Sequence, residues 1–152
     1  MPINKEELKR MINLDEPEYE ALVSRLSAED IPTLVELSKE PDLAIATKAI
    51  SCLGHMGNER ALAGLREAVD HQDPVRRVAA ANSLQNMANV QGSVQLLERL
   101  LDDNDIGVRK FALKTVEAGN ISQLKEKVRV MNEREVNPSL KTLSQQVLQR
   151  LR

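Results

Sequence analysis

The sequence predicts an all-α protein in which about four pairs of helices stack behind an N-terminal helical cap. Two observations support this fold class. One helical pattern recurs four times along the chain at an almost constant spacing, and aromatic residues make up only 1% of the chain while hydrophobic residues make up 41%. A core with so few aromatic side chains must be built from Leu, Val, Ile and Ala, which suit closely packed helices.

The recurring segment begins at a residue that caps helices. Its four copies start at Asp42, Asp73, Asp105 and Asn137, so successive starts lie 31, 32 and 32 residues apart. Asp and Asn accept hydrogen bonds from the first backbone N–H groups of a helix, and two copies continue with Pro, which suits the first helical position. Each copy therefore predicts a helix that begins directly after its capping residue.

Two positions inside the copies indicate how these helices pack. A small residue follows the capping residue by seven places and an aliphatic residue follows it by eleven: Ala49 and Leu53, Ala80 and Leu84, Ala112 and Val116, Ser144 and Leu148. The separation of four residues puts both on one helix face. We expect the small residues to let another helix approach closely and the aliphatic residues to fill the space between layers.

Another amphipathic segment precedes each of these helices, at 31–39, 61–69, 93–101 and 121–131. Gly and Asn residues at 54–58, 88–89 and 119–120 predict the turns that join the helices. The repeating unit is thus helix, turn, helix, and one such pair cannot bury its apolar faces alone. We place the repeats at 28–56, 57–88, 89–119 and 120–152.

Residues 1–27 do not fit the repeat and predict the N-terminal helical cap. Asn4 marks the start of a short helix, and 15–17 marks the start of a second helix that runs to Leu26. Ser27 and Asp30 have the spacing of a capping box that opens the first repeat.

Two strings resemble a known repeat family. Residues 105–116, DIGVRKFALKTV, resemble the HEAT-like signature, and residues 53–62, LGHMGNERAL, resemble the link between HEAT-like repeats. The resemblance covers about residues 28–152, and the short spacing is similar to the subclass first named from phycobilisome lyases. It implies a right-handed α-α superhelix, a HEAT-like solenoid, whose second helices line the concave side. It says little about function, because the motif consists of structural residues.

Charge and composition limit the partners. The net charge is −2 and the pI is about 5.8, whereas binding of duplex nucleic acid depends on a basic surface, so nucleic acid is not the expected partner. Residues 1–30 carry eight acids against four bases, and residues 119–152 carry seven bases against three acids. These charges are either solvated helix faces or the basis of weak end-to-end self-association. No apolar run is long enough for a membrane span, and the polar start and single cysteine favour the cytoplasm.

No group of residues has the pattern of a catalytic, metal or cofactor site. The metal ligands of deoxyhypusine hydroxylase, which shares the HEAT-like architecture, are His-Glu pairs, and neither His55 nor His71 precedes Glu. Cys52 occupies a repeat position that elsewhere holds Ser83, Thr115 and Val147, which indicates packing rather than nucleophilic chemistry. The equivalent residues Arg77, Arg109 and Lys141 are either a basic ladder for an anionic ligand or, as the resemblance implies, part of an Asp–Arg ladder between repeats.

A helical projection of the second helices leaves a polar row exposed on the expected concave face. Its residues are the candidate partner-binding site: Ser51, Val78, Asn82, Gln85, Lys110, Lys114 and Gln146. Phe111, the only Phe, lies beside this row, either as core filler or as an exposed binding residue. The sequence therefore predicts a non-catalytic scaffold for a protein partner, with no cofactor. Two alternatives stay open: attachment or removal of a bilin chromophore, and HEAT-like nucleic-acid binding of the DNA glycosylase type.

Overall fold

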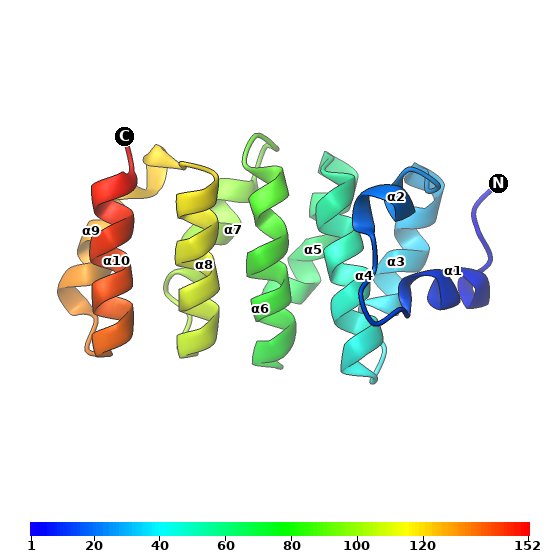
Figure 1. Cartoon of the computed structure of the whole chain (residues 1–152), viewed down its shortest axis with the longest axis horizontal. Coiled ribbons are helices and arrows are strands. Elements are labelled where there is room, and N and C mark those ends of the chain that lie inside the picture. Colours follow the sequence, from blue (N-terminus) through cyan, green and yellow to red (C-terminus); the bar gives the residue numbers. More distant parts are fainter.

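The computed structural model describes all 152 residues, and its regular elements are all helices. The α-helices and the short 3₁₀ helices (η) are α1 Lys5–Ile12, α2 Tyr19–Val23, η1 Ala28–Asp30, α3 Ile31–Leu37, α4 Leu43–Met56, α5 Glu59–Val69, α6 Pro74–Ser83, η2 Leu84–Met87, α7 Ser93–Leu100, α8 Ile106–Ala118, η3 Ser122–Leu124, α9 Lys125–Arg134 and α10 Pro138–Arg150. The pairs α3–α4, α5–α6, α7–α8 and α9–α10 follow one another along the long axis of the molecule (Figure 1). The predicted fold class, an α-α solenoid, is confirmed.

The helix pairs form two layers (Figure 1). The second helices of the pairs, α4, α6, α8 and α10, make a front layer, and the first helices, α3, α5, α7 and α9, lie behind them. All four front helices begin where the capping residues predict. The side chains of Asp42 and Asp73 accept backbone N–H groups at 2.9 Å, and those of Asp105 and Asn137 do so at 3.1 Å.

Small side chains bring the front helices together. The predicted small residues Ala49, Ala80, Ala112 and Ser144 are all fully buried. Gly54, which we placed in a turn, instead lies inside α4, since α4 continues to Met56. A Cβ built on Gly54 would lie 2.7 Å from the Ser83 Cβ and 2.8 Å from the Ser83 carbonyl oxygen. Gly54 therefore marks a close approach of α6 to α4.

Hydroxyl groups add a polar contact at the first two junctions of the front layer. Ser83 Oγ on α6 donates to the Ile50 carbonyl oxygen on α4 at 3.2 Å, and Thr115 Oγ1 on α8 donates to the Ala81 carbonyl oxygen on α6 at 2.7 Å. Val147 holds the same position on α10 and has no hydroxyl to donate. The repeat position ten residues after each capping residue, which holds Cys52, Ser83, Thr115 and Val147, therefore serves packing, as predicted.

The N-terminal segment folds over the first repeat. Helices α1 and α2 both pack against α4, and Asn4 caps α1 as predicted, accepting from the Glu6 N–H at 2.9 Å. The second predicted helix is shorter than expected: α2 begins at Tyr19 rather than at 15–17 and ends before Leu26. Its preceding residue, Glu18, makes no side-chain capping bond, and Ser24 Oγ donates back to the Ala21 carbonyl, a local bond that competes with continuation of the helix.

The predicted capping box is confirmed and has a second use. Ser27 accepts from the backbone at the start of η1, and the Asp30 carboxylate accepts the Ser27 N–H at 2.9 Å. The same buried carboxylate also accepts the Ile3 N–H at 2.6 Å. One side chain thus joins the first residues of the chain to the beginning of the first repeat.

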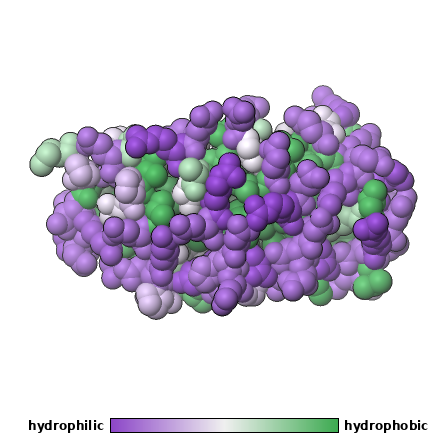
Figure 2. Space-filling model, turned by 180° about the vertical axis from the view of Figure 1, so that it is seen from behind, coloured by the Kyte–Doolittle hydropathy of each residue, from purple (hydrophilic) through white to green (hydrophobic).

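The rear surface is mostly hydrophilic, with smaller hydrophobic areas scattered over it (Figure 2). Ion pairs connect successive rear helices: Lys39 with Glu67 at 2.9 Å, Asp70 with Arg99, and Asp102 with Lys127 at 2.5 Å. Such exposed pairs contribute only about 0–1 kcal/mol each. None of the helices is both long and apolar enough to pass through a bilayer.

Candidate functional site

The predicted partner-binding row lies on the front layer. Val78 and Asn82 lie on α6, with Gln85 in the adjoining η2, Lys110 and Lys114 lie on α8, and Gln146 lies on α10. All of these side chains except Val78 are exposed, and Val78 is half-buried against the core. The structure therefore brings the middle of the row together across the neighbouring helices α6 and α8.

Ser51, the first member of the row, lies beside the N-terminal cap and is half-buried. The Tyr19 ring of α2 stacks on His55, with ring centroids 4.8 Å apart and an interplanar angle of 15°. Burial raises the pKa of Tyr19 above its ordinary value, although a side-chain hydrogen bond with Ser51 acts in the opposite direction. The exposed part of the row therefore begins at α6, because the cap occupies the surface of α4.

The residues Lys110, Phe111 and Lys114 form a compact cluster, which we call the α8 patch. The Nζ atoms of Lys110 and Lys114 lie 5.8 Å and 5.5 Å from the centre of the Phe111 ring, within the range of cation–π attraction. Phe111 is half-buried and packs against the edge of the core. Neither lysine forms an ion pair within the chain. The patch is thus an apolar ring flanked by two free positive charges.

An aliphatic rim accompanies the polar row, and sequence reasoning missed it. Leu43, Val75 and Ile106 lie in the first turns of α4, α6 and α8, and each is exposed by 39% to 50%. Each of them follows its capping residue by one or two places, so an alignment of the repeat copies could have revealed this rim. A partner on this surface would therefore meet apolar side chains as well as polar ones.

The arginines after the second and third capping residues connect neighbouring repeats. Arg77 Nε donates to Asp103 at 2.8 Å with a second bond from Nη2 at 3.1 Å, and Arg109 makes the same pair of bonds to Glu135 at 3.0 and 3.2 Å. The inter-repeat ladder is confirmed, but its acids are not the capping residues. Because carboxylates of the chain itself accept the hydrogen bonds of both guanidinium groups, the alternative of a basic ladder for an anionic ligand is wrong.

The acid in each junction stands two residues before the next capping residue. Asp103 and Glu135 also accept the N–H of Asp105 and Asn137, at 2.9 and 3.1 Å. Burial would raise the pKa of Glu135, but hydrogen bonds from Arg109 and from backbone N–H groups, together with the Arg109 charge, outweigh burial and lower that pKa. The recurrence of Glu40, His71, Asp103 and Glu135 at this position was visible in the sequence.

Glu40 and His71, the residues at this position in the first two repeats, have no arginine of a preceding repeat as a side-chain partner. At Glu40 the partner comes from the N-terminal cap, since Lys5 and Lys9 of α1 lie 3.9 and 3.8 Å from its carboxylate. His71 stands where the preceding repeat has Ala46 instead of Arg, and its Nδ1 accepts the Asp73 N–H at 2.9 Å. His71 therefore has a structural role.

The third equivalent base, Lys141, does not join two repeats. Its Nζ donates to the Asn132 carbonyl at 2.9 Å, and the Asn132 side chain donates to the Lys141 carbonyl and to Ser144 Oγ, so α9 and α10 are tied to each other. A polar hollow of about 330 Å³ adjoins this contact and includes Gln146. Gln146 thus lines this hollow on α10, the helix that packs next to α8.

Cys52 is fully buried on α4, and burial raises the pKa of its thiol to about 12. Because the thiolate is the reactive form, the native protein should not react with Ellman's reagent at pH 8 within minutes, whereas protein in guanidinium chloride should react with one equivalent. Rapid labelling of the native protein would contradict this placement of Cys52.

No three or more His, Cys, Asp or Glu side chains are grouped so that they could hold a metal ion. No curated protein matches the chain. Residues 19–85, from α2 to the end of the second helix pair, match the family described as HEAT repeats. The match over these residues, together with the stacked helix pairs of the whole chain, supports a HEAT-like repeat protein.

Proposed function

We propose that this chain is a non-catalytic scaffold that binds a protein partner on its front layer. HEAT repeats commonly mediate protein–protein contacts. The observation that carries the proposal is the exposed surface of α6 and α8, where Lys110 and Lys114 flank the Phe111 ring and Asn82 is exposed on the neighbouring helix α6. Aromatic side chains, Phe among them, are enriched in protein–protein interfaces.

Packing supports a partner on the concave side of the stack. The front helices approach one another through Gly54 and buried alanines. The rear helices leave hollows of about 510 Å³, one between α3 and α5 and another between α5 and α7. A stack whose helices lie closer together in one layer than in the other curves towards the closer layer, so the close contacts at Gly54 support the front layer as the concave side.

Charge reversal on the α8 patch tests the proposal. With the tagged chain as bait in a lysate, partners recovered by the wild type should bind the double variant Lys110→Glu, Lys114→Glu at least about tenfold more weakly, because like charges then replace complementary ones. The readout is the dissociation constant of each partner, measured by biolayer interferometry with purified proteins.

A matched control on the rear layer separates the patch from general charge effects. Arg60→Glu with Arg66→Glu makes the same change in charge on α5, where both arginines are exposed and form no ion pair. This control should bind the same partners as the wild type. The proposal is wrong if the patch variant keeps every partner, or if the rear variant loses them equally.

A further inference from the structure

The basic C-terminal end offers fewer free charges than its composition suggests. Lys127 is paired with Asp102, Arg129 with Glu126 and Glu133, and Arg150 with Glu117. Neighbouring carboxylates thus neutralise three of the seven bases at this end. Two further unpaired positive charges, Lys110 and Lys114, lie on α8 of the front layer, away from the C-terminal end.

The acidic loop, residues 13–18 between α1 and α2, has the complementary chemistry. Asp15, Glu16 and Glu18 are exposed, and none of them forms an ion pair. Arg10 and Arg25 line the same hollow without pairing with these carboxylates. Leu14 lies next to them and is 54% exposed. The loop thus presents an apolar side chain among negative charges, while the α8 patch presents an apolar ring between positive ones.

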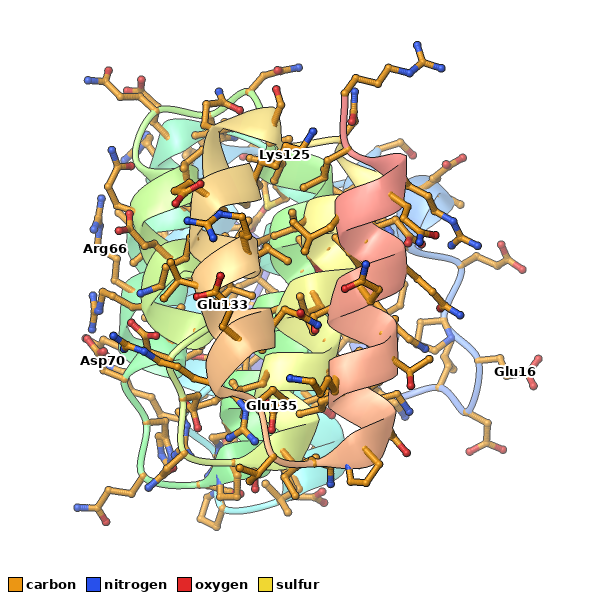
Figure 3. All side chains as sticks on the ribbon, turned by 90° about the vertical axis from the view of Figure 1, so that its left-hand side faces the viewer. Glu16, Arg66, Asp70, Lys125, Glu133 and Glu135 are labelled. Atoms are coloured by element: carbon orange, nitrogen blue, oxygen red, sulfur yellow. The ribbon has the colours of Figure 1, made fainter.

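The loop and the patch cannot meet within one chain. The loop lies over α4 and the patch lies on α8, two helices further along the front layer (Figure 1). Packed helices lie about 8–10 Å apart, so the separation is roughly 16–20 Å. Seen along the stack, Glu16 projects beyond the front layer on the same side as α10, so it is free to contact a facing molecule (Figure 3).

We propose that the acidic loop of one molecule docks on the α8 patch of a second copy, in a reciprocal dimer whose front layers face each other. Both elements lie on the same side of the stack, so a two-fold axis between two facing molecules places each loop over the partner copy's patch. Such a self-complementary contact closes after two copies, which is the commonest symmetry of soluble oligomers. The dimer covers the surface that a foreign partner would use. The experiments below test the dimer without any foreign partner.

Sedimentation equilibrium of the purified full-length chain tests the dimer. The wild type should be a concentration-dependent dimer whose association weakens at least tenfold when salt rises from about 0.05 M to about 0.5 M, since the attraction is between exposed charges. Two variants should each be monomeric: a patch variant, Lys110→Glu with Lys114→Glu, and a loop variant, Glu16→Lys with Glu18→Lys. Circular dichroism spectra like that of the wild type would show that both variants are folded.

Mixing the two variants makes the test specific. In the mixture, each loop finds a patch of opposite charge on the other variant, so a heterodimer should form although neither variant associates alone. The matched control, Lys125→Glu with Arg134→Glu at the C-terminal end, should dimerise like the wild type.

Three results would overturn the proposal. They are a wild type that stays monomeric at low salt and high concentration, a mixture that stays monomeric, and an end control that abolishes association. A chain that stays monomeric but loses foreign partners when Lys110 and Lys114 are reversed would refute the dimer and leave the proposed scaffold function intact.

Discussion

Replacing Arg109 by alanine should lower the free energy of unfolding by about 3 kcal/mol, which is in the range measured when one partner of a buried ion pair is removed. The side chain of Glu135 is only 4% exposed, and Arg109 supplies two of its hydrogen bonds and its counter-charge. The variant leaves that carboxylate buried without a cation. Urea denaturation at pH 7 measures the difference.

The matched control for Arg109 is Arg99, whose partner Asp70 is 58% exposed. Arg99→Ala should cost less than about 1 kcal/mol, because water already solvates both charges. Equal losses for the two variants would show that the burial of Glu135 has no energetic consequence.

The Arg109–Glu135 pair makes the free energy of unfolding depend on pH. The pKa of Glu135 is lowered in the folded state, so its ionised form stabilises the fold above the unfolded-state pKa of about 4.3, and this contribution is lost as pH falls through the folded-state pKa. The stability difference between wild type and Arg109→Ala should therefore shrink as pH falls below about 4.

Gly54→Ala should destabilise the protein by about 2 kcal/mol, although alanine favours helices over glycine. Two of the three atoms within 3.0 Å of the added Cβ, the Ser83 carbonyl oxygen and Cα, belong to the backbone of α6. Helix α6 must therefore move away from α4, and the bond from Ser83 Oγ to the Ile50 carbonyl would lengthen with it.

Gly107→Ala is the control for this change, since Gly107 lies in the first turn of α8. An added Cβ there would meet only the ends of the Asp105 and Val78 side chains, at 3.1 and 3.6 Å. Gly107→Ala should leave the stability unchanged or raise it by up to about 1 kcal/mol. Thermal unfolding of both variants decides the matter, and a stabilised Gly54→Ala protein would contradict the close approach of α4 and α6.

Local chemistry explains which parts of the fold were predictable. Each front helix begins after Asp or Asn because a side-chain oxygen two or three residues away satisfies the first N–H groups, and this depends on a few adjacent residues only. The role of Gly54 depends on a helix 29 residues further along the chain, so its place inside α4 was mistaken for a turn. Likewise the position of Ser51 beside Tyr19 depends on how the non-repeating N-terminal segment folds back.

The candidate site shows the same division. The exposure of Asn82, Lys110 and Lys114 follows from helical periodicity, and the structure agrees. The roles of the acids Asp103 and Glu135 were not predicted, although both recur at one repeat position, because each acid pairs with an arginine 26 residues earlier in the chain. Their role emerges only when the second helix of one repeat lies beside the turn of the next. The resemblance to the phycobilisome lyase subclass stays a prediction.

The junction contacts give the stack a direction. The second and third repeats each offer an arginine towards the C-terminus, and the third and fourth repeats receive it through the acid two places before their own capping residue. The N-terminal cap supplies the bases for Glu40 of the first repeat. The repeats are therefore not interchangeable blocks. Omitting the third repeat would set Arg77 against Glu135, a workable pair, whereas repeating the first pair would set Ala46 against Glu40 and leave that carboxylate without a base. A rearranged array is thus compatible or incompatible according to a simple pairing rule carried by two positions per repeat.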